Sequence, residues 1–182
     1  MTGKIIEINE QKVKDHLGEF VRNTVEETSW KRFLQYLKGR GLDKINLIIS
    51  DKSQGLIEVI PDFYPGAKWQ RCMVHFYRNV FSYVPHSKIK EVATMLKAIH
   101  AQENIKEARR KKDMVIERLM ETKLGKAAET IRQGCDENFS YYSFPVEHWK
   151  RIRTNNGLER IMKEIRRRTR VVITYNIFRT IR

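Results

Sequence analysis

The pattern of apolar positions centres on one short run, Ile45 to Ser50, which ends at Asp51. An unbroken run of β-branched and aliphatic residues is typical of a strand that is buried on both faces of a parallel or mixed sheet. Functional side chains in such sheets gather at the carboxyl edge, where the strands end. Two interpretations of Asp51 are therefore open: it caps a helix that follows it, or it belongs to a functional site.

Two segments with helical periodicity precede this run. Residues 1–28 predict a short strand and an amphipathic helix, with no clear partner in the rest of the chain. Residues 29–40 predict a second helix, because apolar side chains recur on one face at Trp30, Phe33, Leu34 and Leu37. The order helix, loop, strand leads directly to Asp51.

After Asp51 the pattern predicts a helix, a strand and a second helix, and then helices only. Residues 56–60 predict a helix, residues 67–72 a short strand, and residues 74–83 another helix. Residues 88–134 carry apolar stripes at helical spacing and contain no proline, so they predict a block of helices. The aromatic run at 141–144 closes this block, and core packing is its favoured interpretation over base stacking.

A last helix is predicted from about Thr154 to Arg170, with one apolar stripe and a basic outer surface. An arginine-rich helix of this kind can lie on a sheet while its outer surface contacts phosphates, although it can also be merely solubilising. The basic residues expected to bind DNA are Arg160, Lys163, Arg166, Arg167, Arg168 and Arg170.

The charge strengthens the nucleic-acid interpretation. The chain of 182 residues has a formal net charge of +14, which favours DNA or RNA over a membrane as partner. Residues 147–182 hold 11 basic and three acidic side chains, whereas residues 1–28 hold four basic and six acidic ones. No apolar run approaches the roughly 20 residues of a membrane span, and the N-terminus lacks a signal-peptide core, so we expect a cytoplasmic protein.

An aspartate at a strand end and a glutamate on a later helix could hold Mg²⁺, which prefers carboxylate oxygens. Bound ions of this kind can drive phosphodiester cleavage, although that chemistry normally needs a third carboxylate. Periodicity leaves Glu159 and Glu164 equally placed relative to the apolar stripe, and Glu159 also fits a capping box with Asn156.

Cys72 and His75 form a single C-x₂-H pair. A structural zinc site needs four ligands, usually from two such pairs, so zinc is weakly supported. A buried cysteine at a strand end with a polar histidine nearby is the more ordinary interpretation.

These residues resemble a known family. The motifs are D-x₃-G-L and P-x-A-x₂-Q-R-C-x₂-H-F-x-R-N over residues 51–79, then F-P-x₂-H-W and R-T-N-x₂-L-E-R-x₂-K-E-I-R-R-R-T-R-V-V over residues 144–172. Together they are similar to the signature of Mutator-type bacterial insertion-sequence transposases, with a match in order over about residues 29–172. The resemblance implies an α/β chain that is helical for the most part, with an RNase H-like core and an all-helical insertion.

The resemblance also implies a DDE mechanism, in which three carboxylates bind Mg²⁺ for DNA cleavage and strand transfer. Asp51 matches the second aspartate, and Glu159 matches the glutamate, 108 positions later. Cys72 and His75 match the family's C-x₂-H element, for which we expect a role in the core near the site. The expected partners are DNA at the insertion-sequence ends and an intact transposase or a second copy of the chain.

The first aspartate of the family has no clear counterpart. Asp15 is the only aspartate upstream of Trp30, and it falls in a helical pattern. Residues 4–28 resemble the extreme N-terminus of such transposases, whereas residues from about Ser29 resemble the middle of the core. We therefore expect an internal deletion and an incomplete sheet with the Asp51 strand at its centre.

The expected organisation is an N-terminal remnant (1–28), a partial core (29–86), a helical insertion (87–146), a returning basic helix (147–172) and a divergent, shortened tail (173–182). We expect Asp51 and Glu159 to approach each other without a third carboxylate, so that Mg²⁺ binds weakly and catalysis is lost. The alternatives are a fragment that inhibits transposition by binding DNA or an intact transposase, and an active enzyme that receives a carboxylate in trans.

Overall fold

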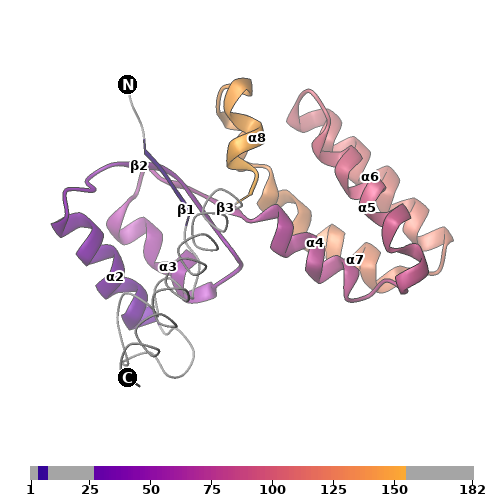
Figure 1. Ribbon diagram of the computed structural model, residues 1–182, viewed down its shortest axis with the longest axis horizontal. Helices are drawn as coiled ribbons and strands as arrows, with labels where there is room; N and C mark the ends of the chain where they lie inside the picture. Colours follow the sequence, from indigo (N-terminus) through magenta and orange to yellow (C-terminus); the bar gives the residue numbers. More distant parts are fainter. Residues whose placement is uncertain (1–3, 8–26, 155–182) are drawn as a thin grey trace, which may run out of the picture.

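The computed structural model describes residues 4–7 and 27–154 (Figure 1). Within them, three parallel strands form one sheet in the order β1 (Lys4–Glu7), β2 (Ile45–Ser50) and β3 (Lys68–Arg71). The predicted strand before Asp51 is therefore β2, and its central position is confirmed. An α/β fold that is predominantly helical is confirmed as well.

The N-terminal segment does have a partner, contrary to the expectation from sequence. The residues of β1 pair in parallel with β2, from Ile5 opposite Leu47 to Glu7 opposite Ile49. Four residues are too few for periodicity to indicate which strand they join, because the pairing is made by backbone groups rather than by a side-chain pattern.

One face of the sheet is covered by α2 (Glu27–Gly39) and α3 (Gln54–Phe63). Ile48 packs there in a core with Trp30 and Leu56, all fully buried. The two helices approach closely at Gly55, where an added Cβ would lie 3.3 Å from both the Glu27 backbone nitrogen and the Trp30 ring. A side chain at this position would push the helices apart, which gives the glycine a packing reason.

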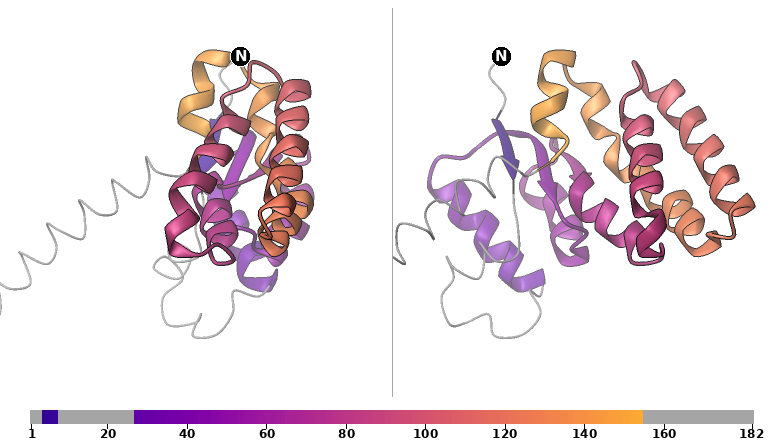
Figure 2. Two further views of the ribbon diagram at one scale, coloured as in Figure 1. Left: turned by 90° about the vertical axis from the view of Figure 1, so that its right-hand side faces the viewer. Right: turned by 45° about the vertical axis from the view of Figure 1, so that its right-hand side comes forward.

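The other face of β2 packs against the helical part of the chain. Leu47 and Ile49 belong to a second core that includes α4 (Met73–Phe81), α5 (Ile89–His100), α6 (Ile105–Glu121) and α7 (Gly125–Gly134). The prediction of a strand buried on both faces is thus confirmed. These four helices extend away from the sheet as a lobe of their own (Figures 1 and 2).

The predicted helical block is divided by two turns. Asn104 begins α6, because its side chain accepts a hydrogen bond from the Glu107 backbone N–H at 3.0 Å. Lys123, with φ of 61°, reverses the chain between α6 and α7. The helix α7 then packs against both α6 and α4.

After α7 the chain returns to the sheet through short helical turns: η3 (Cys135–Asn138), η4 (Ser140–Ser143), η5 (Val146–His148) and α8 (Trp149–Ile152). The aromatic run packs in the core as predicted. The rings in mutual contact are Phe139, Tyr141, Tyr142, Trp149 and His100. None of the helices in the described part of the chain has the length and apolar character to cross a membrane.

Candidate active site at the carboxyl edge of the sheet

Asp51 follows β2 directly and is partly buried at the carboxyl edge of the sheet. Its Oδ1 atom is buried and accepts no hydrogen bond from the residues that the structure describes. The helix-cap interpretation is wrong, because Ser53 is the N-cap residue of α3. Asp51 contributes its backbone carbonyl instead, which accepts from the Ser53 N–H at 2.9 Å and the Ser50 hydroxyl at 2.7 Å. No helix-capping bond therefore occupies Oδ1 among the described residues.

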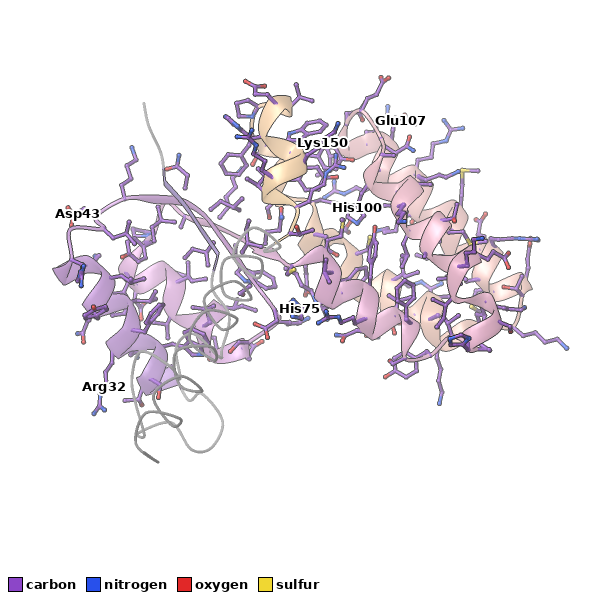
Figure 3. All side chains as sticks on the ribbon, in the orientation of Figure 1. Arg32, Asp43, His75, His100, Glu107 and Lys150 are labelled. Atoms are coloured by element: carbon purple, nitrogen blue, oxygen red, sulfur yellow. The ribbon has the colours of Figure 1, made fainter. Side chains whose placement is uncertain are left out.

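Cys72 and His75 lie at the same edge. Cys72 is fully buried between β3 and α4, and its N–H donates to the Ser50 carbonyl at 2.6 Å. His75 is in the first turn of α4, where the strand ends meet the helical lobe (Figure 3). Its pKa is raised above the ordinary value, chiefly by a hydrogen bond with the Cys72 side chain, with smaller contributions from the charges of Cys72 and Asp51. Desolvation and Arg78 oppose this rise.

The returning chain is fastened to the same edge by Gln70, which is fully buried. The Gln70 Nε2 donates to the Ile152 carbonyl at 2.6 Å, and its Oε1 accepts from the Tyr141 N–H at 2.7 Å. The Met73 N–H also donates to the Arg153 carbonyl at 3.3 Å. The last of these bonds brings residue 153 beside the first turn of α4.

A charged cluster that was not predicted lies next to Asp51. One carboxylate oxygen of Glu137 accepts a hydrogen bond from Lys52 Nζ at 2.6 Å, and the other accepts one from Arg71 Nη1 at 3.2 Å. The Asn138 side chain donates to the Arg71 carbonyl at 2.8 Å. Glu137 is separated from its two partners by 66 and 85 residues, and no local pattern indicates such a pairing.

Several predicted site residues lie outside the described residues. They are Glu159 and the six basic residues Arg160, Lys163, Arg166, Arg167, Arg168 and Arg170. The approach of Asp51 to Glu159 therefore stays a prediction. In residues 4–7 and 27–154, no group of three or more His, Cys, Asp or Glu side chains is arranged to hold a metal ion.

The fold and this edge define an α/β protein with a helical lobe and, at the end of its central parallel strand, an aspartate whose Oδ1 has no partner among the described residues. Sequence comparison gives its family. The profile described as "Transposase, Mutator family" matches residues 5–178, so the chain belongs to the Mutator family of transposases, as the motifs indicated.

Individual relatives agree with this assignment. The chain is 32% identical over 160 residues to the transposase for insertion sequence element IS256 in transposon Tn4001 of Staphylococcus aureus, covering 87% of this chain and 41% of that protein. It is 37% identical over 163 residues to the IS406 transposase of Burkholderia multivorans, covering 85% of this chain and 40% of the relative. For the IS1081 transposase of Mycobacterium tuberculosis the identity is 32% over 165 residues, with coverage of 91% and 40%. The chain thus spans about two fifths of the length of these curated relatives.

Proposed function

We propose that the chain is an insertion-sequence transposase core that retains two of three catalytic carboxylates and binds DNA at the ends of the element, without strand transfer of its own. The observation that carries this proposal is Asp51, whose carboxylate ends the central strand with its Oδ1 buried and unpaired among the described residues. A parallel α/β sheet with its functional group at the carboxyl edge also suits an RNase H-like core.

Glu159 is the second carboxylate of this proposed site. The chain has returned to the carboxyl edge by Arg153, through the bonds of Gln70 and Met73. Glu159 follows only six positions later. Its approach to Asp51 is part of this proposal, which the short chain separation from Arg153 supports, because six residues span at most about 20 Å when fully extended.

The fit of the site to Mg²⁺ is partial. A buried carboxylate oxygen without a hydrogen-bond donor is a suitable ligand for a hard cation. When bound, such an ion activates a nucleophilic hydroxyl and stabilises the leaving oxygen of a phosphodiester. Asp51 would hold the ion from the strand end and Glu159 from the returning helix, while Cys72 and His75 would help to keep this edge of the sheet in place. Two carboxylates hold Mg²⁺ weakly, so the proposed chain lacks strand-transfer activity by itself.

The domain boundaries follow from the same proposal. Residues 29–86 form the partial core, residues 87–146 the helical insertion, residues 147–172 the returning basic helix, and residues 173–182 a divergent tail. Residues 1–28 are a remnant joined at an internal deletion. Its strand β1 then pairs with β2 and covers backbone groups that would otherwise form an open sheet edge.

A second function is favoured by the charge of the chain. Residues 147–182, with 11 basic and three acidic side chains, can bind DNA without any catalysis. Such a fragment would compete with an intact transposase for the element's ends, or would join it in an inactive complex. A soluble cytoplasmic location is part of this proposal.

Strand transfer with purified chain tests the catalytic part of the proposal. The substrate is DNA that bears the element's ends, with Mg²⁺ or Mn²⁺, and we expect no cleaved or transferred product. Cleavage that disappears in both Asp51→Ala and Glu159→Ala would overturn the claim of inactivity and favour a carboxylate supplied in trans. Gel-shift assays across a salt series test the binding function, and absence of binding near physiological salt would refute it.

A further inference from the structure

A cavity of about 480 Å³ lies between the carboxyl ends of β2 and β3 and the helices α4 and α7. Lys52, the residue after Asp51, is part of its lining. Polar side chains make up most of its lining. The lining residues are Lys52, Arg71, Asn79, Ser82, Tyr83, Thr130, Gln133 and Gly134.

Two cations give this cavity its electrostatic character. Arg71 is only 7% exposed, and Lys52 reaches the same carboxylate, Glu137, from the outer side. One carboxylate shared by two cations leaves an excess of one positive charge. The Nε of Arg71 also has no acceptor among the described residues, so its surroundings do not use the full donor capacity of the guanidinium. An anionic ligand would be favoured at this position.

The position of the guanidinium is set by close packing. A Cβ added to Gly134 would lie 2.8 Å from Arg71 Nη1 and 3.1 Å from the Phe76 ring. The guanidinium carbon of Arg71 in turn lies 5.1 Å from the centre of the Phe76 ring. Arg71 is therefore held between the end of α7 and the first turns of α4, in a fixed orientation toward the cavity.

The remaining lining suits a group larger than a phosphate ion. Tyr83 is 50% exposed after the end of α4 and offers an aromatic face, while Asn79 carries an amide that can bond the edge of a base. The Gln133 Nε2 donates to Glu129 at 2.8 Å, so Gln133 offers its amide oxygen as an acceptor. The cavity volume is within the roughly 300–1,000 Å³ that ligand pockets occupy. A bare phosphate would leave most of this space empty.

We propose that the cavity binds a single nucleotide of a DNA strand outside the duplex, with its phosphate on Arg71 and Lys52 and its base against Tyr83. The inference rests on the proposed function only in taking DNA as the partner. Lys52 in the cavity lining directly follows Asp51. A nucleotide bound there would therefore hold the adjoining part of the DNA strand close to the proposed catalytic carboxylate.

The test is the binding of a short fluorescent single-stranded deoxyoligonucleotide to the full chain, followed by polarisation. Lys52→Gln removes one charge-assisted contact and should weaken binding by about tenfold. Lys106→Gln removes the same charge from an exposed position at the start of α6, outside the cavity lining, and should change affinity by less than about twofold. Equal losses in the two variants would show that only the overall charge matters and would overturn the proposal.

Two further variants change the cavity without removing a cation. Glu137→Gln frees both cations from their internal carboxylate and should tighten binding several-fold, opposite in sign to Lys52→Gln. Tyr83→Ala keeps the charge and should weaken binding by about fivefold or more through lost stacking. Thermal unfolding followed by circular dichroism confirms that each variant is folded. Weaker binding by Glu137→Gln in a folded chain would contradict the assignment.

Competition separates the possible sources of the phosphate. A deoxynucleoside monophosphate should displace the oligonucleotide far better than inorganic phosphate at the same concentration and ionic strength. Equal competition by the two would reduce the cavity to an anion site and overturn the assignment of a nucleotide. The proposed function fails separately, when duplex DNA with the element's ends is not bound, because the difference between Lys52→Gln and Lys106→Gln in single-strand binding reports on the cavity.

Discussion

The strongest test of how this edge is assembled is Gln70→Leu. Gln70 joins β3 to the returning chain through two buried bonds, one to the Ile152 carbonyl and one from the Tyr141 N–H. Leucine has a similar size, is apolar, and can make neither bond. The substitution therefore keeps the volume and removes only the polar connection that brings the chain back toward Glu159.

The expected loss follows from the groups that are left behind. The Tyr141 N–H and the Ile152 carbonyl would both lose a partner, at roughly 1–3 kcal/mol for each buried group. The gain from burying an apolar side chain in place of an amide offsets part of this cost. We expect Gln70→Leu to lower the free energy of unfolding by about 3 kcal/mol, which is a large part of the roughly 5–15 kcal/mol that stabilises a typical domain.

Urea unfolding of the purified chain measures this loss. The midpoint should fall in Gln70→Leu while the m-value stays unchanged, because the surface exposed on unfolding is nearly the same. The matched control is Gln54→Leu, at an exposed position where the amide bonds only the exposed Glu58 carboxylate at 2.8 Å, and its effect should lie within about 0.5 kcal/mol. A loss below about 1 kcal/mol in Gln70→Leu would refute the claim that these two bonds hold the returning chain.

Three further predictions concern particular residues. Burial lowers the pKa of His100 from 6.5 to about 3. Between pH 3 and pH 6.5, therefore, His100 is protonated in the unfolded chain and neutral in the folded chain. The free energy of unfolding should therefore fall as the pH drops through this window, by up to about 1.4 kcal/mol per pH unit from this group. Urea unfolding at pH 5 and pH 7 measures this difference, and His100→Phe should make it smaller. Gly134→Ala should destabilise the chain by about 1–3 kcal/mol through overpacking, whereas Gly125→Ala in the same helix should stabilise it by up to about 1 kcal/mol; similar thermal midpoints for the two variants would contradict the close contact. Cys72→Ala should lower the pKa of His75 in an NMR titration, because the hydrogen bond with Cys72 is the largest cause of its rise, and an unchanged pKa would exclude that bond.

Much of the architecture could be predicted from sequence because it depends on local burial. The run from Ile45 to Ser50 is apolar on both faces, and β2 is buried on both faces in the centre of the sheet. The periodicity of residues 88–134 predicted helices, and the aromatic run at 141–144 predicted core packing. The spacing of the family motifs identified the transposase family, which the comparisons confirm. For the strand, the helices and the aromatic run, the determining signal lies within a few turns of the chain.

The tertiary structure decided which segments meet. It paired β1 with β2, made Ser53 rather than Asp51 the cap of α3, and placed Glu137 between Lys52 and Arg71. Periodicity shows that a side chain is buried or exposed, but it does not show the partner, because the partner depends on the path of the whole chain. For the same reason, the sequence located one half of the proposed site and the fold located the return of the chain to it. The sequence by itself determined that Asp51 stands at a strand end, whereas only the fold, through the bonds of Gln70, decided that the chain returns to that edge at Ile152, seven residues before Glu159.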